Sequence, residues 1–349
     1  MNSRERVRIA LSHHEPDRVP VDFGGTFLTS APESLQRAIA EVLGLRGERD
    51  PRFPDFDHRI QDYFDCDLRS VTPVRFPNWG YREVHEAPLR HAAIEDLDRY
   101  CWPEPKDELV LGVRERAQFL HERTARFVCA SQIGEGIFET GCYLRGYDQI
   151  LLDMALDPAF VHAFNRKVLE TDIRFGDLYF PEVGDCADMV LVGDDLATQH
   201  APYMSPAHFR EFVKPYFREY IAAIKRHCPR AVVAHHCCGS SFRLLDDLTD
   251  IGIEVINPVQ TTAAEMSPGN LATKKHRLSF LGGVDLQHVL PYGTAQEVED
   301  FVKDLIRDLA PGGGYILAAC HTLPEDVKPE NIAVMLEAAR RWGGYPLGW

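Results

Sequence analysis

The sequence predicts an α/β protein of the (β/α)8 TIM-barrel class with an elaborated N-terminal helical segment, and three observations support this prediction. Short apolar runs recur along the chain, amphipathic helical stretches separate the later runs, and several of those runs lead directly into reactive polar residues. Strands that alternate with helices form parallel sheets. The polar residues would then gather at the carboxyl ends of the strands, where barrels carry their active sites.

Eight runs that are rich in β-branched or apolar residues and bounded by turn residues are interpreted as strands. They occupy residues 19–23, 71–76, 127–133, 189–192, 231–234, 254–256, 278–281 and 315–319. Between the later strands, residues 206–227 and 294–309 carry apolar side chains at helical spacing on one face, which predicts two helices. Eight strands of this kind are enough to close a barrel.

The chain is predicted to be a single domain spanning residues 1–349. This length could make two average domains, but single α/β barrels also reach it, and no repeat, low-complexity tract or Gly/Ser linker divides the sequence. Residues 26–70 and 78–126 are longer than ordinary connections. We therefore expect residues 1–126 to include an N-terminal extension and long insertions at the rim of the barrel.

Composition excludes several classes of function. A hydrophobic fraction of 45% with 26% charged residues is ordinary for a soluble enzyme, and no apolar run reaches the roughly 20 residues that span a bilayer. The start of the chain has no signal-peptide pattern, so we expect a cytoplasmic protein without a membrane partner. A net charge of -15 without clustered Lys and Arg disfavours nucleic acid as a partner. An acidic surface and long insertions leave room for a homodimer.

The nine cysteines are spaced irregularly, which does not resemble a disulfide framework. Reduced thiols are therefore expected, as is usual in the cytoplasm. Some of these cysteines then serve as small buried apolar residues. Others remain available to bind a metal ion.

His236, Cys238 and Cys320 are the candidate metal ligands, and each follows the apolar part of a predicted strand. Residues two apart on a strand point the same way, so His236 and Cys238 can share one ion. Two thiolates and one imidazole suit a catalytic zinc, which keeps its fourth position for the reacting group. The pattern therefore indicates zinc-assisted chemistry.

Two other interpretations of these residues stay open at this point. Cys238 and Cys320 can be buried apolar side chains, with His236 a hydrogen-bonded histidine of the core. The opposite register, in which His235 and Cys237 are the ligands, is also compatible with strand alternation.

Further polar residues at strand ends complete the predicted site. The aspartates and the histidine among them have plainer alternatives, because aspartates in such places often cap helices or form turns and a histidine can lie at the surface. The candidate catalytic carboxylates are Asp194, Asp195 and Asp285. The candidate substrate-binding residues are Asn257, Gln260 and His321.

A series of short motifs follows one another along nearly the whole chain. They are Glu15-Pro-Asp-Arg-Val-Pro20, Val192-Gly-Asp-Asp-Leu196, Met204-Ser-Pro206 with Lys214-Pro215, His236-x-Cys-Gly239, Ile256-Asn-Pro-Val-Gln260, Leu281-Gly-Gly-Val-Asp285, and Pro311-Gly-Gly-Gly-Tyr-Ile316 through Pro329-Glu-Asn331. In content and order they resemble the superfamily of uroporphyrinogen decarboxylase and the methylcobamide:coenzyme M methyltransferases.

The methyltransferase branch of that superfamily holds zinc with a His-x-Cys after the fifth barrel strand and a Cys after the eighth. His236, Cys238 and Cys320 match this pattern position by position. The resemblance thus implies a zinc-dependent enzyme that moves a methyl group between a methyl-corrinoid and a thiol or other small acceptor. The chain lacks the corrinoid-binding pattern D-x-H-x-x-G, so the resemblance implies that a partner protein supplies the corrinoid (methylcobalamin).

The decarboxylase branch implies the alternative function, decarboxylation without a cofactor. Those enzymes carry an Arg-Gln-Ala-Gly-Arg segment after the first strand to hold the carboxylates of the substrate. Here the corresponding place reads Asp22-Phe-Gly-Gly-Thr26. Without these arginines a polycarboxylate would find little opposite charge in an acidic protein, which favours the methyltransferase prediction.

Overall fold

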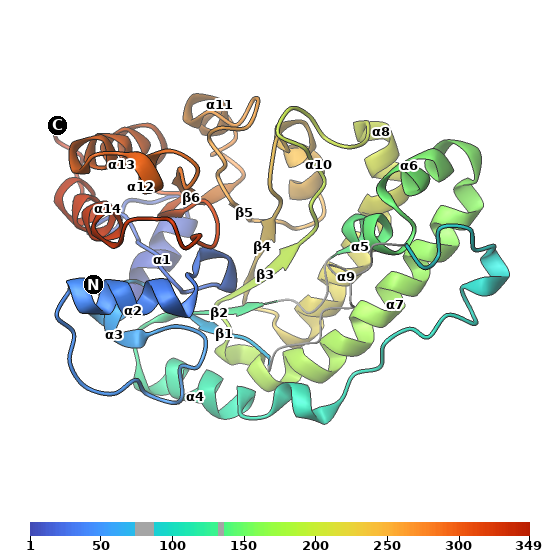
Figure 1. Ribbon diagram of the computed structural model, residues 1–349, viewed down its shortest axis with the longest axis horizontal. Helices are drawn as coiled ribbons and strands as arrows, with labels where there is room; N and C mark the ends of the chain where they lie inside the picture. The colour runs from blue at the N-terminus through green and yellow to red at the C-terminus, as the bar shows by residue number, and fades with distance from the viewer. Residues whose placement is uncertain (74–86, 132–135) are drawn as a thin grey trace.

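A parallel sheet of seven strands forms the centre of the molecule, as seen in a computed structural model that describes residues 1–73, 87–131 and 136–349 (Figure 1). The strands follow one another in chain order, each paired in parallel with the next. This confirms the predicted α/β class with a parallel sheet. The strands are β1 (Leu68–Val71), β2 (Phe127–Ser131), β3 (Met189–Gly193), β4 (Val232–His236), β5 (Val255–Asn257), β6 (Ser279–Val284) and β7 (Tyr315–Ala319).

The pairing register brings the polar ends of neighbouring strands into line. Gly193 at the end of β3 lies opposite His236 at the end of β4, and His236 lies opposite Asn257 at the end of β5. Since all strands run the same way, the reactive residues that follow them meet at one edge of the sheet. The predicted gathering of polar residues at the carboxyl ends therefore holds for these strands.

Residues 19–23 were predicted to be the first strand, and the structure corrects this. Val21 makes an isolated parallel bridge with Leu317 of β7, and no longer strand forms there. The backbone of Asp22 donates to Leu317, and the backbone of Asp67, just before β1, donates to Val21, each at 2.8 Å. This short segment thus lies between the two edge strands β1 and β7. Proline at position 20 cannot donate, and the chain turns at Gly24, where φ is +73°, so the pairing stays short.

The second predicted strand, residues 71–76, was displaced along the chain. The strand in the structure is β1, which ends at Val71, and residues 74–76 lie outside the described residues. Arg69 interrupts the apolar run of β1, so a search for apolar residues misses this strand. Its side chain is nevertheless buried and donates to Asp62 at 2.7 Å. The third prediction, 127–133, matches β2 up to Ser131, and 132–133 lie outside the described residues.

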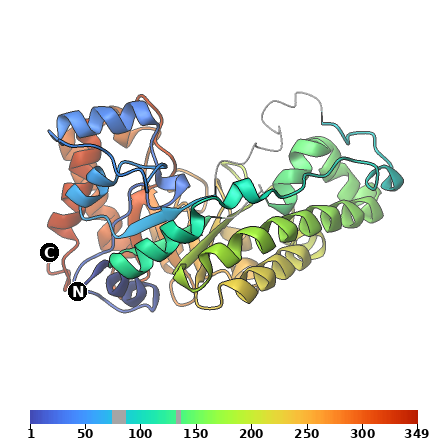
Figure 2. The same ribbon diagram turned by 90° about the horizontal axis from the view of Figure 1, so that it is seen from below.

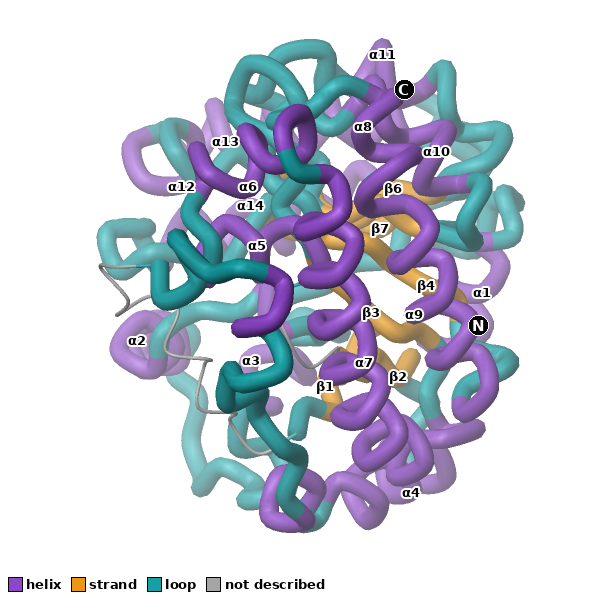
Figure 3. Tube along the Cα trace, turned by 90° about the vertical axis from the view of Figure 1, so that its right-hand side faces the viewer, coloured by secondary structure: helices purple, strands orange, loops and turns teal. Residues whose placement is uncertain are grey.

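Helices enclose the sheet, and α7 packs against α4, α5, α6 and α9 (Figures 2 and 3). Three helices precede β1: α1 (Ser3–Leu11), α2 (Glu33–Val42) and α3 (His58–Tyr63). The others are α4 (Val113–Arg123), α5 (Ile137–Leu144), α6 (Tyr147–Leu156), α7 (Pro158–Val183), α8 (Pro206–His208), α9 (Lys214–His227), α10 (Leu245–Thr249), α11 (Pro268–Ala272), α12 (Val289–Tyr292), α13 (Ala295–Leu309) and α14 (Pro329–Trp342). Short 3-10 helices cover Phe27–Thr29, Ile94–Asp96, Asp107–Val110, Gly184–Cys186 and Phe242–Leu244.

The two helices predicted with residue ranges are both present, and one is interrupted. Helix α13 begins directly after Thr294, whose side chain accepts from the backbone of Glu297. The predicted helix 206–227 is divided into α8, a π-helical turn at Phe209–Val213 and α9. Pro215 lacks the N–H that would continue regular α-helical bonding at this point, which accounts for the irregular turn.

Every strand contributes to a buried cluster on the inner face of the sheet, which shows that the sheet curls around its own core. Val7 of α1 and Leu28 join this cluster from the N-terminal part of the chain. The strand members are Leu68, Phe127, Cys129, Met189, Leu191, Ala234, Val255, Leu281 and Ile316. A larger buried cluster joins the outer face of the sheet to the helices. Among the described residues, no helix combines the length and apolar character required to cross a bilayer.

Candidate metal centre

Three ligand-bearing side chains converge at the carboxyl ends of β4 and β7. One nitrogen of His236, the sulfur of Cys238 and one nitrogen of His321 all lie within 4.8 Å of one another. The rings of His236 and His321 are inclined at 68° to each other, with their centroids 5.1 Å apart. Within the described parts of the chain, this is the group of histidine, cysteine and acidic side chains whose geometry could hold a metal ion.

The orientation of His236 follows from a hydrogen bond to Asn257. The side-chain nitrogen of Asn257 donates to the carbonyl of Leu281 at 3.2 Å, so its Oδ1 is the atom that faces Nδ1 of His236 at 2.7 Å. Nδ1 must therefore carry the proton, which leaves the Nε2 lone pair directed to the side of Cys238, whose Sγ lies 3.5 Å away. Burial lowers the pKa of His236, which favours the neutral ring that metal binding requires.

The loop that carries Cys238 is held by two side chains predicted for the site. Asp195 accepts from the backbone of Cys238 and Gln260 accepts from the backbone of Gly239, each at 2.7 Å. Gly239 has a φ of +84°, and a Cβ there would come within 2.4 Å of the carbonyl oxygen of Thr198. Only glycine fits this turn without a shift of the backbone, so the loop has a defined course directly after Cys238.

Cys320 lies beside this group but is not a member of it. Its side chain is buried, and burial raises the pKa of its thiol to about 11. Burial also holds the pKa of the Cys238 thiol well above its usual range, and the charges of Asp195 and Cys320 contribute to this shift. Two of the three predicted ligands are thus brought together, and His321 joins them in the group whose ligand atoms lie within 4.8 Å of one another. The assignment of Cys320 as a ligand stays a prediction.

The neighbouring pair His235 and Cys237 points away from the group. The ring of His235 is fully buried and packs against Phe217 of α9, with centroids 5.1 Å apart. The sulfur of Cys237 accepts from the backbone of Leu196 at 3.3 Å. The register that brings ligands together is therefore that of His236 and Cys238.

The predicted catalytic aspartates make structural hydrogen bonds. Asp194 accepts from three backbone N–H groups in the first turn of α5 at 2.8 to 3.0 Å, and burial raises its pKa to about 7. Asp285 accepts from the backbones of Gln287 and His288 at 2.8 and 3.2 Å. These contacts agree with the alternative roles of cap and turn residue. The catalytic roles of Asp194, Asp195 and Asp285 remain predictions, as do the substrate-binding roles of Asn257, Gln260 and His321.

Glu139 was not predicted for the site. It lies in α5, where it accepts from the backbone of Asp195 at 3.3 Å and from the hydroxyl of Tyr143 at 2.9 Å. A strand-end pattern could not reveal a residue within a helix, and the contact arises because Asp194 holds the start of that helix. The position of His321 did carry a signal, since it follows Cys320 directly at the end of β7.

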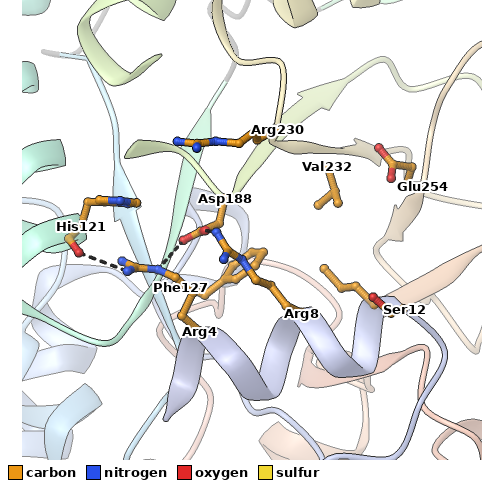
Figure 4. A pocket seen from close by; sticks show the side chains of 10 residues that line it. Arg4, Arg8, Ser12, His121, Phe127, Asp188, Arg230, Val232 and Glu254 are labelled. Carbon is orange, nitrogen blue, oxygen red and sulfur yellow. Dashed lines mark hydrogen bonds and ion pairs between the residues drawn. The ribbon is translucent and has the colours of Figure 1, made fainter. Parts of the chain in front are cut away.

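A separate cavity of about 540 Å³ opens at the amino ends of the strands, where the sequence predicted no site (Figure 4). One side of α1, along its length to the C-cap Ser12, and the starts of neighbouring strands surround it. Its lining residues are Arg4, Arg8, Leu11, Ser12, His121, Phe127, Asp188, Arg230, Val232 and Glu254.

The curled parallel sheet and the polar cluster at its carboxyl edge define an enzyme-like α/β protein. A model of the uroporphyrinogen decarboxylase (URO-D) family matches residues 74–342, and the chain belongs to this family. This agrees with the resemblance carried by the sequence motifs.

Two single proteins resemble the chain, one in sequence and one in structure. A uroporphyrinogen decarboxylase from Chlorobium limicola is 22% identical over 194 residues, which are 53% of this chain and 50% of that protein, so the chain spans about half the length of this relative. A solved methyltransferase from Methanosarcina mazei has a TM-score of 0.64 at 16% identity, covering 98% of this chain and 99% of the other. At that identity the likeness establishes the shared fold.

Proposed function

We propose that this chain is a zinc-dependent methyltransferase that moves a methyl group between a corrinoid carried by a separate protein and a small thiol. The observation that carries the proposal is the convergence of His236, Cys238 and His321, with Cys320 beside them, at the carboxyl edge of the sheet. Nitrogen and sulfur donors in this number suit zinc better than the hard cations, which prefer oxygen. The residues present therefore fit the metal that the family resemblance implies.

A zinc ion bound by these residues would supply the Lewis acidity that lowers the pKa of a substrate thiol into the neutral range. The roles of the chain itself follow from the contacts described above. His236 and Cys238 provide two ligands, Asn257 keeps the ligating nitrogen of His236 unprotonated, and Asp195 fixes the backbone of Cys238. Cys320 is proposed as a second thiolate ligand, and His321 as a group that lies close enough to contact the same ion.

The corrinoid is proposed to arrive on a partner protein, because the sequence contains no D-x-H-x-x-G segment that would bind it. We place the reaction in the cytoplasm, since the described cysteines are all free and the chemistry depends on reduced thiols. We also propose that residues 20–22, which join β7 to the start of β1, close the sheet into a barrel. A closed barrel would hold the metal ligands of β4 and β7 at one mouth.

The alternative is a decarboxylase that needs no cofactor, which the family match by itself allows. The segment that would hold substrate carboxylates argues against it. Asp22 is fully buried and accepts from the hydroxyl of Thr29 at 2.6 Å and from the backbone of Gly25 at 2.8 Å. A buried acid at this place offers nothing to attract a polycarboxylate.

The test is zinc content combined with demethylation of methylcobalamin by a small thiol, followed through the cobalamin absorbance. We expect about one zinc per chain and thiol-dependent demethylation. Cys238→Ala should lose both, whereas Cys101→Ala, which replaces an exposed cysteine, should retain both. A zinc-free protein that leaves methylcobalamin intact but releases carbon dioxide from a carboxylated tetrapyrrole would support the decarboxylase instead.

A further inference from the structure

We infer that the cavity at the amino ends of the strands binds a small molecule that carries a phosphate group. This site is separate from the proposed metal centre and does not depend on the proposed function. The lining residues Phe127 and Val232 begin β2 and β4, while Asp188 and Glu254 directly precede β3 and β5. Val232 and His236 lie at opposite ends of β4, four residues and so roughly 13 Å apart at the rise of a strand.

Ion pairs to one buried carboxylate hold part of the cavity wall in place. The side chain of Asp188 is only 1% exposed and accepts from Arg4 at 3.0 Å, from Arg8 at 2.6 Å and from the backbone of Val128 at 2.9 Å. The remaining nitrogens of Arg4 donate to the carbonyls of residues 120, 121 and 126. The hydrogen-bonding groups of Arg4 and Asp188 are therefore satisfied within the protein, and these two side chains form a fixed part of the cavity wall.

Other hydrogen-bond donors on the cavity wall are not fully engaged by the protein itself. Arg8 donates to Asp188 through Nη2, and its side chain is 58% exposed. Arg230 reaches over the cavity above Asp188, as Figure 4 shows, and contacts Asp185 at 3.3 to 3.4 Å. Nδ1 of His121 is buried and has no hydrogen-bond partner within the described residues. A buried polar atom of this kind normally finds a partner, which indicates that a ligand or solvent completes the site.

The charges of the wall favour an anion. With the ion-pair partners of the lining residues included, four cations (Arg4, Arg8, Arg230 and Lys225) face three carboxylates (Asp188, Glu254 and Asp185), which leaves an excess of one positive charge. This local excess of positive charge occurs in a chain with a net charge of -15. Guanidinium groups bind phosphate with paired, charge-assisted hydrogen bonds, and phosphate has more acceptor oxygens than a carboxylate with which to meet donors from several sides.

The size and the apolar wall suit a small organic molecule. A cavity of about 540 Å³ lies within the usual range for small-molecule sites. Leu11, Phe127 and Val232 form an apolar part of the wall, next to the hydroxyl of Ser12. An organic group attached to the phosphate would contact these side chains, while the phosphate would face Arg8, Arg230 and His121.

Calorimetric titration of the purified full chain with inorganic phosphate and with glycerol 3-phosphate tests this inference, with glycerol as the neutral control at equal ionic strength. We expect saturable binding of both anions, tighter for glycerol 3-phosphate, and none of glycerol. Arg8→Gln and Arg230→Gln should each weaken binding about tenfold, the usual scale for losing a charge-assisted hydrogen bond. Arg37→Gln, which removes an equally charged residue from an exposed pair on α2, should leave binding unchanged.

Arg230→Gln breaks only an exposed pair, so it keeps the test valid if Arg8→Gln destabilises the fold. Absence of saturable binding at millimolar phosphate would overturn the inference. So would unchanged affinity in both cavity variants, or an equal loss in Arg37→Gln, which would indicate nonspecific attraction. Zinc content and demethylation are measured separately, so neither result decides the other.

Discussion

At the scale of single residues, the candidate metal centre depends on how His236 is oriented. Its Nδ1 donates to Asn257, and the amide of Asn257 is itself fixed by the carbonyl of Leu281. This places the free lone pair of the ring at the side of Cys238. Groups that orient a ligating histidine in this way commonly affect metal affinity by 10- to 100-fold.

Asn257→Leu is therefore expected to weaken zinc binding by about 10- to 100-fold, because the ring of His236 loses its acceptor and can turn. Competition with a chromophoric chelator measures the change. Asn257→Asp should restore most of the affinity, since a carboxylate accepts the same hydrogen bond. Equal affinities in the wild type and in Asn257→Leu would show that the hydrogen bond does not orient the ligand.

Substituting cobalt for zinc distinguishes the roles of the adjoining residues Cys320 and His321 as metal ligands. Cobalt bound to thiolates has charge-transfer absorbance that grows with the number of sulfur ligands. We expect Cys320→Ala to reduce this absorbance by about half, because one of two thiolates is lost. His321→Ala should keep the absorbance and lower the affinity less. If Cys320→Ala leaves the absorbance unchanged, Cys320 is not a ligand and the group seen in the structure is complete.

At the scale of elements, hydrogen bonds to side-chain carboxylates hold helices in position against neighbouring elements. Asp194 accepts from the first turn of α5 and so ties that helix to the end of β3. Asp247 of α10 plays a similar part at the interrupted helix, where it accepts from Arg210 at 2.9 Å and from Lys214 at 2.7 Å. Arg210 lies in the π-helical turn and Lys214 begins α9, so this carboxylate bonds to both parts of the interrupted helix.

The contribution of Asp247 to stability should depend on pH. Burial alone would raise its pKa, but hydrogen bonds from Arg210 and Lys214 outweigh burial and hold the pKa below its usual value. A carboxyl with a lowered pKa stabilises the fold above its unfolded pKa of about 3.9, and this contribution is lost as the pH falls through the lower, folded value. Asp247→Asn should lower the melting temperature at pH 7. Below about pH 4 the difference in melting temperature between the wild type and Asp247→Asn should become smaller.

The neighbouring Asp246→Asn is the matched control for this prediction, because Asp246 is exposed and pairs with Lys274 at the surface. It should change the melting temperature little at any pH. Thermal unfolding followed by circular dichroism at several pH values compares the three proteins. If the difference in melting temperature between the wild type and Asp247→Asn stays constant across the acidic range, the ionisation of Asp247 does not contribute to stability as proposed.

At the scale of the whole molecule, a buried ionic network joins the N-terminal segment to the sheet. Asp67, just before β1, is fully buried and accepts from Arg6 of α1 at 2.7 Å, from Arg18 at 2.8 Å and from the backbone of Val21 at 2.8 Å. The same segment bonds to Leu317 of β7. One carboxylate thus helps to hold α1 and residues 18–21 between the two edges of the sheet.

Asp67→Asn is expected to lower the free energy of unfolding by about 1–3 kcal/mol, because Arg6 and Arg18 each lose a charge-assisted hydrogen bond but keep Asp17 and Asp65 as partners. Urea denaturation measures this change. Glu33→Gln, which disrupts an exposed pair with Arg37, is the control and should change stability by less than about 0.5 kcal/mol. Similar losses of unfolding free energy in Asp67→Asn and Glu33→Gln would show that the ionic network does not stabilise the packing of the N-terminal segment on the sheet.

The later strands were predictable because burial on both faces leaves near-continuous apolar runs. β7 appears with the predicted bounds, and β3 differs by one residue. The first two predictions failed where polar residues take part: Arg69 lies buried within β1, and residues 19–23 pair only around Val21. An ion pair or a single bridge leaves no periodic signal, so apolar patterning could not locate these segments.

The sequence by itself determined the later strands, their alternation with helices, and the family, because periodicity and short motifs are local properties of a chain. Only the tertiary structure decided that His236 and Cys238, in place of His235 and Cys237, meet His321, that Asp194 caps α5, and that three arginines line a cavity at the other end of the strands. These features join residues far apart in the chain. Their distances depend on how the sheet curls and how side chains pack, which no local pattern records.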